Sequence, residues 1–156
     1  MGKIIRLIKK LPYNRIRAWK EAIKMGIGER PWPEHAPSIH VDKTPQDLEA
    51  ELRGAHYEGL YLSYDYQGQV LELRRPEGVD ADYKQLEVHP RARNHPDKNG
   101  LELIAHIERS RYEHKSDHIN EEGFRWLTED ELEVIAEGES LGITGEVVQG
   151  GWSYAN

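Results

Sequence analysis

The chain has 156 residues, 37% of them hydrophobic, and a net charge of −7, so it can form one domain with a buried core. It has no cysteine, which excludes disulfides and thiolate chemistry. No apolar run approaches the roughly 20 residues that cross a bilayer, and charged residues interrupt the apolar N-terminus, which argues against a signal peptide. We therefore expect a protein of the cytoplasm or of a virion that is neither secreted nor membrane-spanning.

Positive charge is concentrated at the start of the chain. Residues 1–25 carry eight basic residues and one acidic residue, a net charge of +7, so the rest of the chain carries −14. Beyond residue 25, only four lysines accompany 27 carboxylates. An acidic chain with few lysines and no cysteine is typical of a salt-adapted, halophilic source, and equally of an ordinary acidic protein. This uneven distribution of charge is evidence about binding partners and solubility, and not about the fold.

Residues 1–28 are predicted to form a basic amphipathic helical arm. Apolar residues between 4 and 11 lie on one helical stripe, Pro12 stops or kinks that helix, and Asn14 is placed to cap a second one. Ile16, Trp19 and Ile23 share a face of this second helix. The arm either docks on a membrane, on nucleic acid or on an acidic neighbour, or packs on its own sheet.

Residues 29–43 contain three prolines and are predicted to form a linker or an exposed arm. Trp32 lies within this segment. An aromatic side chain on an extended arm often fills a pocket of a neighbouring molecule, and the alternative is that Trp32 folds back onto its own domain.

Residues 44–140 are predicted to form an α+β core domain with two short helices. Thr44-Pro45 begins the first, which Gly54 closes. Thr128 and Glu131 match a capping box at the start of the second. We expect both helices to pack on one face of a sheet.

The stretch from Gly59 to Tyr112 is predicted to form an antiparallel meander of about four strands. Alternating apolar and polar residues place the strands at 60–66, 70–74, 83–88 and 101–112. Gln67-Gly68 and Lys98-Asn99-Gly100 are typical turn sequences. We expect a break at Pro76-Glu77-Gly78 after the second strand, and a polar loop between Val88 and Leu101.

Residues 141–156 form a predicted tail that is rich in glycine and aromatic residues. Trp152 and Tyr154 lie near its end. Because a free tail does not normally carry these side chains, we expect the tail to dock, either on its own chain or on a neighbour.

Two motifs resemble catalytic or metal-binding patterns. His114 and His118 have the i, i+4 spacing of helical metal sites, but their surroundings predict strand and loop, so we expect surface histidines. Asp97, Glu113 and Lys115 imitate the P-D…(D/E)-x-K pattern of Mg²⁺-dependent nucleases, in which two carboxylates hold the metal. Asp97 lies next to the turn predicted at Lys98-Asn99-Gly100, which argues against this pattern. We therefore assign no catalytic residue, cofactor or metal ligand.

Arg91 and Arg93 lie in the most basic cluster of the predicted core domain. Together with Arg74 and Arg75 they could bind phosphate. The alternatives are a solvated turn, or pairing with the chain's own carboxylates.

Several segments follow one another in an order that resembles small tail-completion or neck proteins of tailed viruses. They are the apolar and lysine-bearing residues 4–12, the helical residues 19–23, Ala36-Pro37, and the segments 82–87 and 91–96. The resemblance implies a non-enzymatic ring subunit at a head–tail junction, whose helix and arms contact its neighbours.

We therefore predict a non-enzymatic assembly subunit, a homo-oligomer or part of a larger assembly. The alternatives are a module that binds nucleic acid or a membrane surface through residues 1–25, and a Mg²⁺-dependent nuclease. The predicted interface residues are Ile16, Trp19, Ile23, Trp32, Arg91, Arg93, Trp152 and Tyr154.

Overall fold

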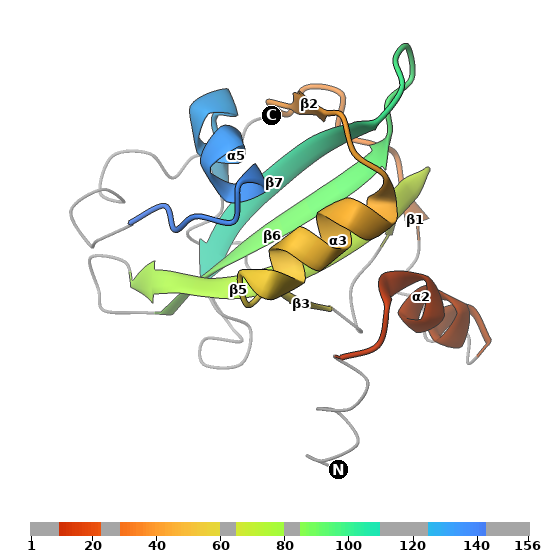
Figure 1. The fold of residues 1–156 in the computed structure, drawn as a ribbon, viewed down its shortest axis with the longest axis horizontal. Helices are drawn as coiled ribbons and strands as arrows, with labels where there is room; N and C mark the ends of the chain where they lie inside the picture. The colour runs from red at the N-terminus through yellow and green to blue at the C-terminus, as the bar shows by residue number, and fades with distance from the viewer. Residues whose placement is uncertain (1–9, 23–28, 60–64, 80–84, 110–124, 143–156) are drawn as a thin grey trace.

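The computed structural model describes residues 10–22, 29–59, 65–79, 85–109 and 125–142. The fold is α+β, as the sequence predicts, with a mostly antiparallel sheet and helices packed against one of its faces (Figure 1). Within the described ranges no helix is both long and apolar enough to cross a membrane.

Three long strands form the centre of the sheet. They are β5 (Gln69–Val79), β6 (Gln85–Asn94) and β7 (Leu101–Arg109), each antiparallel to the next. The turns predicted at Gly68 and Gly100 are confirmed, since both glycines have positive φ, of 76° and 95°. A Cβ atom at Gly100 would lie 2.5 Å from the carbonyl oxygen of Val41, so this turn also requires the absence of a side chain.

Two predicted interruptions of these strands are wrong. β5 continues through Pro76-Glu77-Gly78 to Val79, with a register shift where Gly78 has a φ of 109°. Residues 89–94, predicted as a polar loop, belong to β6 and pair with β7 along their whole length.

Short strands extend the sheet at both edges. β2 (Ile39–Val41) and β8 (Arg125–Trp126) both pair with β7, and β3 (Glu58–Gly59) pairs with β5. A separate parallel pair joins β1 (Glu29–Arg30) to β4 (Asp65–Tyr66). Residues 29–43 therefore contribute two strands to the fold, and the prediction of a linker there is wrong.

Local signals explain where two of the helices begin. In α3 (Pro45–Gly54) the Thr44 hydroxyl accepts a hydrogen bond from the Asp47 amide, as predicted. In α5 (Glu129–Ala136) the predicted capping box of Thr128 and Glu131 is present. The third described helix, α2 (Tyr13–Ala22), begins one residue before the predicted cap Asn14, because the carbonyl of Pro12 accepts the first amides.

The two faces of the central sheet differ in character. One face carries Leu71, Leu73, Leu103 and similar side chains, which pack against α3 and α5. Each such side chain stabilises the fold by about 1.5–3 kcal/mol when it leaves water. The alternate residues of the same strands point to the opposite face, and most of them are charged.

Candidate metal centre on the charged face of the sheet

Seven buried ionisable side chains gather on the face of the sheet opposite α3 and α5, which we call the charged face. Each is at most 7% exposed. Burial of a charge is costly unless a partner of opposite charge and hydrogen bonds compensate for it. These side chains must therefore be arranged as a network. They are Glu72 and Arg74 of β5, Glu87, His89 and Arg91 of β6, and His106 and Glu108 of β7.

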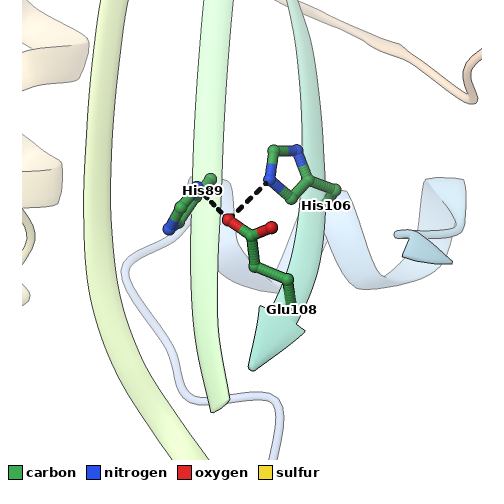
Figure 2. A group of neighbouring side chains, drawn as sticks. All are labelled: His89, His106 and Glu108. Atoms are coloured by element: carbon green, nitrogen blue, oxygen red, sulfur yellow. Dashed lines mark ion pairs between the residues drawn. The ribbon is translucent and has the colours of Figure 1, made fainter. Parts of the chain in front are cut away.

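Three of these side chains converge on one point between β6 and β7. The register places His89 directly opposite His106, and Glu108 follows two residues later on β7, on the same face. Glu108 Oε1 lies 3.0 Å from His89 Nδ1 and 3.3 Å from His106 Nε2. Figure 2 shows this carboxylate oxygen between the two imidazole rings. We call His89, His106 and Glu108 the triad.

His89 separates two carboxylates that would otherwise repel each other. Glu87 and Glu108 face each other across β6 and β7, an arrangement of like charges that destabilises a sheet. His89 binds both: its Nε2 lies 3.1 Å from Glu87 Oε2, and its Nδ1 faces Glu108. The other oxygen of Glu87 accepts a hydrogen bond of 2.8 Å from Arg74. The Glu87 carboxylate thus fixes the orientation of the His89 ring.

The pKa values of the triad follow from these contacts. Burial acts to lower the pKa of His89, but Glu108 and Glu87 outweigh it and raise this pKa to about 9. Burial lowers the pKa of His106 to about 4, so this ring is neutral near pH 7 and its contact with Glu108 is a hydrogen bond. Burial acts to raise the pKa of Glu108, but the two histidines hold it well below its usual range.

A second set of polar contacts continues the network along the charged face toward α2. Arg91 contacts Glu72 at 3.1 Å and donates to Gln69 Oε1 at 2.8 Å. The side-chain amide of Gln69 donates in turn, through Nε2, a hydrogen bond of 2.7 Å to the hydroxyl of Tyr13. The polar network therefore connects the middle of the sheet with the first turn of α2.

Aromatic side chains cover part of the charged face. Trp126 of β8 meets the ring of His106 edge-on, with 5.7 Å between the ring centroids, and His35 meets Trp126 in the same manner at 6.1 Å. Trp32 and Tyr66 pack with Trp126 and Ile104 in a small apolar cluster. His35 is exposed and His106 is buried, so Trp126 lies between the solvent side and the triad.

Most of the described residues that the sequence predicts as interface residues lie inside this fold. Ile16, Trp32 and Arg91 are 0%, 6% and 1% exposed, so the prediction that they face a neighbouring molecule is wrong. Ile16 belongs to α2, which contacts β5 of its own chain. Trp32 folds back onto its own domain, and Arg91 pairs with its own carboxylate, both among the alternatives considered from the sequence.

Arg93 keeps some exposure but is also engaged within the chain. Its guanidinium binds Glu102 at 2.6 Å and Glu34 at 2.9 Å, and lies over the ring of Trp32. It thereby fixes the segment around Trp32 against the charged face. The side chain of Trp19, and all of Ile23, Trp152 and Tyr154, lie outside the described residues, and their roles stay predictions.

The catalytic-looking motifs contribute nothing to the triad within the described ranges. Asp97 is exposed in the turn between β6 and β7. Glu113, Lys115, His114 and His118 lie outside the described residues.

The triad itself was not predicted from the sequence, although a signal for it exists. Glu87-Val88-His89 and His106-Ile107-Glu108 are mirror-image patterns on two strands that run in opposite directions. The match becomes visible only once residues 89–94 are assigned to a strand.

Comparisons of the chain with protein-family models, with curated proteins and with solved structures find no match. The resemblance to tail-completion proteins therefore stays a prediction.

Proposed function

We propose that this protein binds a divalent transition-metal ion through His89 Nδ1, His106 Nε2 and Glu108 Oε1. The observation that carries the proposal is the convergence of one ligand atom from each residue, all within 4.8 Å of one another, on a buried face of the sheet. Two imidazoles and one carboxylate form a common set of protein ligands for zinc and for non-haem iron.

The separations between the ligand atoms fit a shared metal ion. Bonds of about 2.1 Å at tetrahedral angles place neighbouring ligand atoms about 3.4 Å apart. Glu108 Oε1 lies 3.0 Å from one ligand nitrogen and 3.3 Å from the other. A metal ion would replace the hydrogen atoms through which the two ring nitrogens now bind Glu108 Oε1, with little movement of the strands.

The surroundings of the triad have the form that a metal centre requires. A histidine that binds a metal through one ring nitrogen usually donates a hydrogen bond from the N–H group of the other to a carboxylate. This bond fixes the tautomer and orients the ring. Glu87 occupies this position for His89, and Arg74 holds Glu87 in turn. Two imidazoles favour zinc or iron over magnesium and calcium, which prefer oxygen ligands. The proposed centre would act as a Lewis acid toward whatever occupies its remaining positions.

Zinc affinity of the full-length, chelator-treated protein tests this proposal, measured by competition with a chromophoric chelator. We expect stoichiometric binding in the wild type. Glu108→Gln keeps the shape of the side chain but removes the charged ligand, and should weaken binding at least roughly 100-fold, beyond the effect of outer contacts. Glu87→Gln keeps all three ligands but removes the carboxylate that orients His89, and should weaken binding about 10–100-fold.

Two double variants control for adventitious binding. The ring of the exposed His40 lies with its centroid 5.3 Å from that of the half-buried His95, a typical place for weak metal binding. His40→Ala/His95→Ala and His114→Ala/His118→Ala should both retain the wild-type affinity. If either double variant abolishes binding while Glu108→Gln retains it, the metal centre does not lie at the triad.

The prediction of an assembly subunit does not depend on this proposal. It now rests on the basic N-terminus and on residues outside the described ranges, above all Trp152 and Tyr154.

A further inference from the structure

We propose that the metal-loaded centre takes a small anion, such as a carboxylate or an inorganic anion of a few atoms, as its exogenous ligand. This inference rests on the proposed metal site and names the class of molecule that would complete it. Three arguments carry it: the number of protein ligands, the charge of the network and the space around the triad.

The triad leaves at least one coordination position for an outside ligand. The described ranges bring three ligand atoms together at this point. Zinc centres with three protein ligands bind water or substrate in the fourth position, and iron centres with the same ligands keep open positions for exogenous molecules.

The charge of the network determines the kind of ligand. The triad and the charged side chains beside it on the charged face include three carboxylates and two guanidiniums, and metal-bound imidazoles are neutral. These groups sum to one negative charge, which a divalent ion converts to one positive charge. A buried positive charge is costly, so an anionic ligand that neutralises it should bind much better than a neutral one. The charges involved are those of Glu72, Glu87, Glu108, Arg74 and Arg91.

Arg91 is the group whose charge reaches the triad from the side. It follows His89 by two residues on β6 and so projects from the same face. It pairs across the sheet with Ile104, two residues before His106 on β7. A ligand bound at the metal would experience the field of this guanidinium.

The burial of the triad limits the size of the ligand. His89, His106 and Glu108 are 4%, 2% and 5% exposed, and Trp126 covers His106. The described surroundings therefore favour an anion of a few atoms over an extended substrate.

Azide binding to the full-length protein loaded with Co²⁺ tests the inference. The d–d absorption bands of Co²⁺ report first whether the metal occupies a low-symmetry protein site, and then whether an added ligand enters its coordination sphere. We expect azide to change these bands in a saturable manner, at concentrations at least about tenfold below those at which neutral imidazole does so.

Charge variants separate electrostatic attraction from simple access. Arg91→Gln removes one positive charge and should weaken azide binding about tenfold, while Arg91→Gln/Glu72→Gln removes both charges of the pair and should restore it. The double variant also keeps the test valid if the single variant is poorly folded.

The possible outcomes distinguish the two proposals. If Co²⁺ gives no protein-site bands, the metal centre itself is refuted. If Co²⁺ binds but azide leaves its bands unchanged, or binds no better than imidazole, the metal centre stands and the anion inference is overturned.

Discussion

The two faces of the central sheet are built from the same three strands but depend on their side chains in different ways. On the face toward α3 and α5, leucine, valine and isoleucine side chains pack without directional bonds, and the largely buried Arg75–Glu77 pair lies near the end of β5. On the charged face, each ionisable group is held by particular partners, such as Glu72 by Arg91 and Glu87 by Arg74. Truncation of a side chain on the apolar face removes only the stabilisation that this side chain supplied. Truncation of an ionisable side chain on the charged face also leaves its partner buried without a counter-charge, so single substitutions should have different consequences on the two faces.

Removal of one charge from the Glu72–Arg91 pair is expected to have the largest effect. Glu72→Leu deprives the buried guanidinium of the carboxylate that lies 3.1 Å away, and should lower the free energy of unfolding by about 3–5 kcal/mol. Glu72→Leu/Arg91→Met removes both charges and should be more stable than the single variant. Urea unfolding, monitored by circular dichroism, measures both variants.

Leucine truncations on the opposite face provide the matched comparison. Leu71→Ala should cost about 2–5 kcal/mol, because Leu71 is fully buried. Addition of Leu132→Ala from α5 should destabilise the protein further, whereas the second substitution at the charged pair should restore stability. If both double variants are less stable than their single variants, the proposed difference between the two faces does not hold.

Tyr57 offers a second test of the contrast between burial and specific partners, because burial is the main cause of its pKa shift. Burial raises the pKa of Tyr57 to about 12, against an opposing effect of Arg75, whose guanidinium lies 4.4 Å from the ring centroid. Because the pKa of Tyr57 is higher in the folded protein than the unfolded value of 10.0, the protonated hydroxyl favours the folded state. This contribution to the free energy of unfolding is complete below pH 10 and is lost as the pH rises toward 12. The loss should reach roughly 2–3 kcal/mol.

Unfolding free energies measured from pH 9 upward in the wild type and in Tyr57→Phe isolate this effect. The variant lacks the ionisable group, so the difference between the two proteins should change with pH. Near pH 7 the variant should be at least as stable as the wild type, because the buried Tyr57 hydroxyl makes no hydrogen bond within the described ranges. Parallel pH profiles for the two proteins would show that Tyr57 titrates normally.

The parts of the fold that depend on residues close together in the sequence were predictable from it. The caps at Thr44 and Thr128 and the turns at Gly68 and Gly100 each act over a few residues, and all four are confirmed. The alternation between residues 101 and 112 correctly predicted a strand, β7, in which Leu103, Ala105 and Ile107 face the core.

The second half of β6, residues 89–94, could not be predicted in the same way, because two features of this strand usually indicate a loop. Pro90 cannot donate a hydrogen bond to a sheet, and proline is rare in central strands. Alternate charged residues normally face water, as on the outer side of an antiparallel sheet. Here both features lie inside the fold: Pro90 pairs with Ala105, and Glu87, His89 and Arg91 find partners on the flanking strands.

The triad depends on pairing between residues that are distant in the sequence. His89 and His106 meet because β6 and β7 align in one particular register, and a shift by one residue would turn one ring to the other face of the sheet. Composition shows eight histidines but does not show which of them are opposite each other.

The smallest expected effect concerns the connection between the two faces. Thr128 caps α5, which covers the apolar face, and Thr128→Ala should lower the free energy of unfolding by about 1 kcal/mol. Glu131, the other member of this cap, also binds Arg125 of β8 at 2.7 Å, and the next residue of β8 is Trp126, which contacts His106. Because the substitution leaves the Glu131–Arg125 pair in place, zinc affinity should not change even though stability falls. Thr128→Ser, which keeps the hydroxyl, is the control. A loss of zinc affinity in Thr128→Ala alone would mean that the cap of α5 positions β8 against the triad, and that the two faces are not independent.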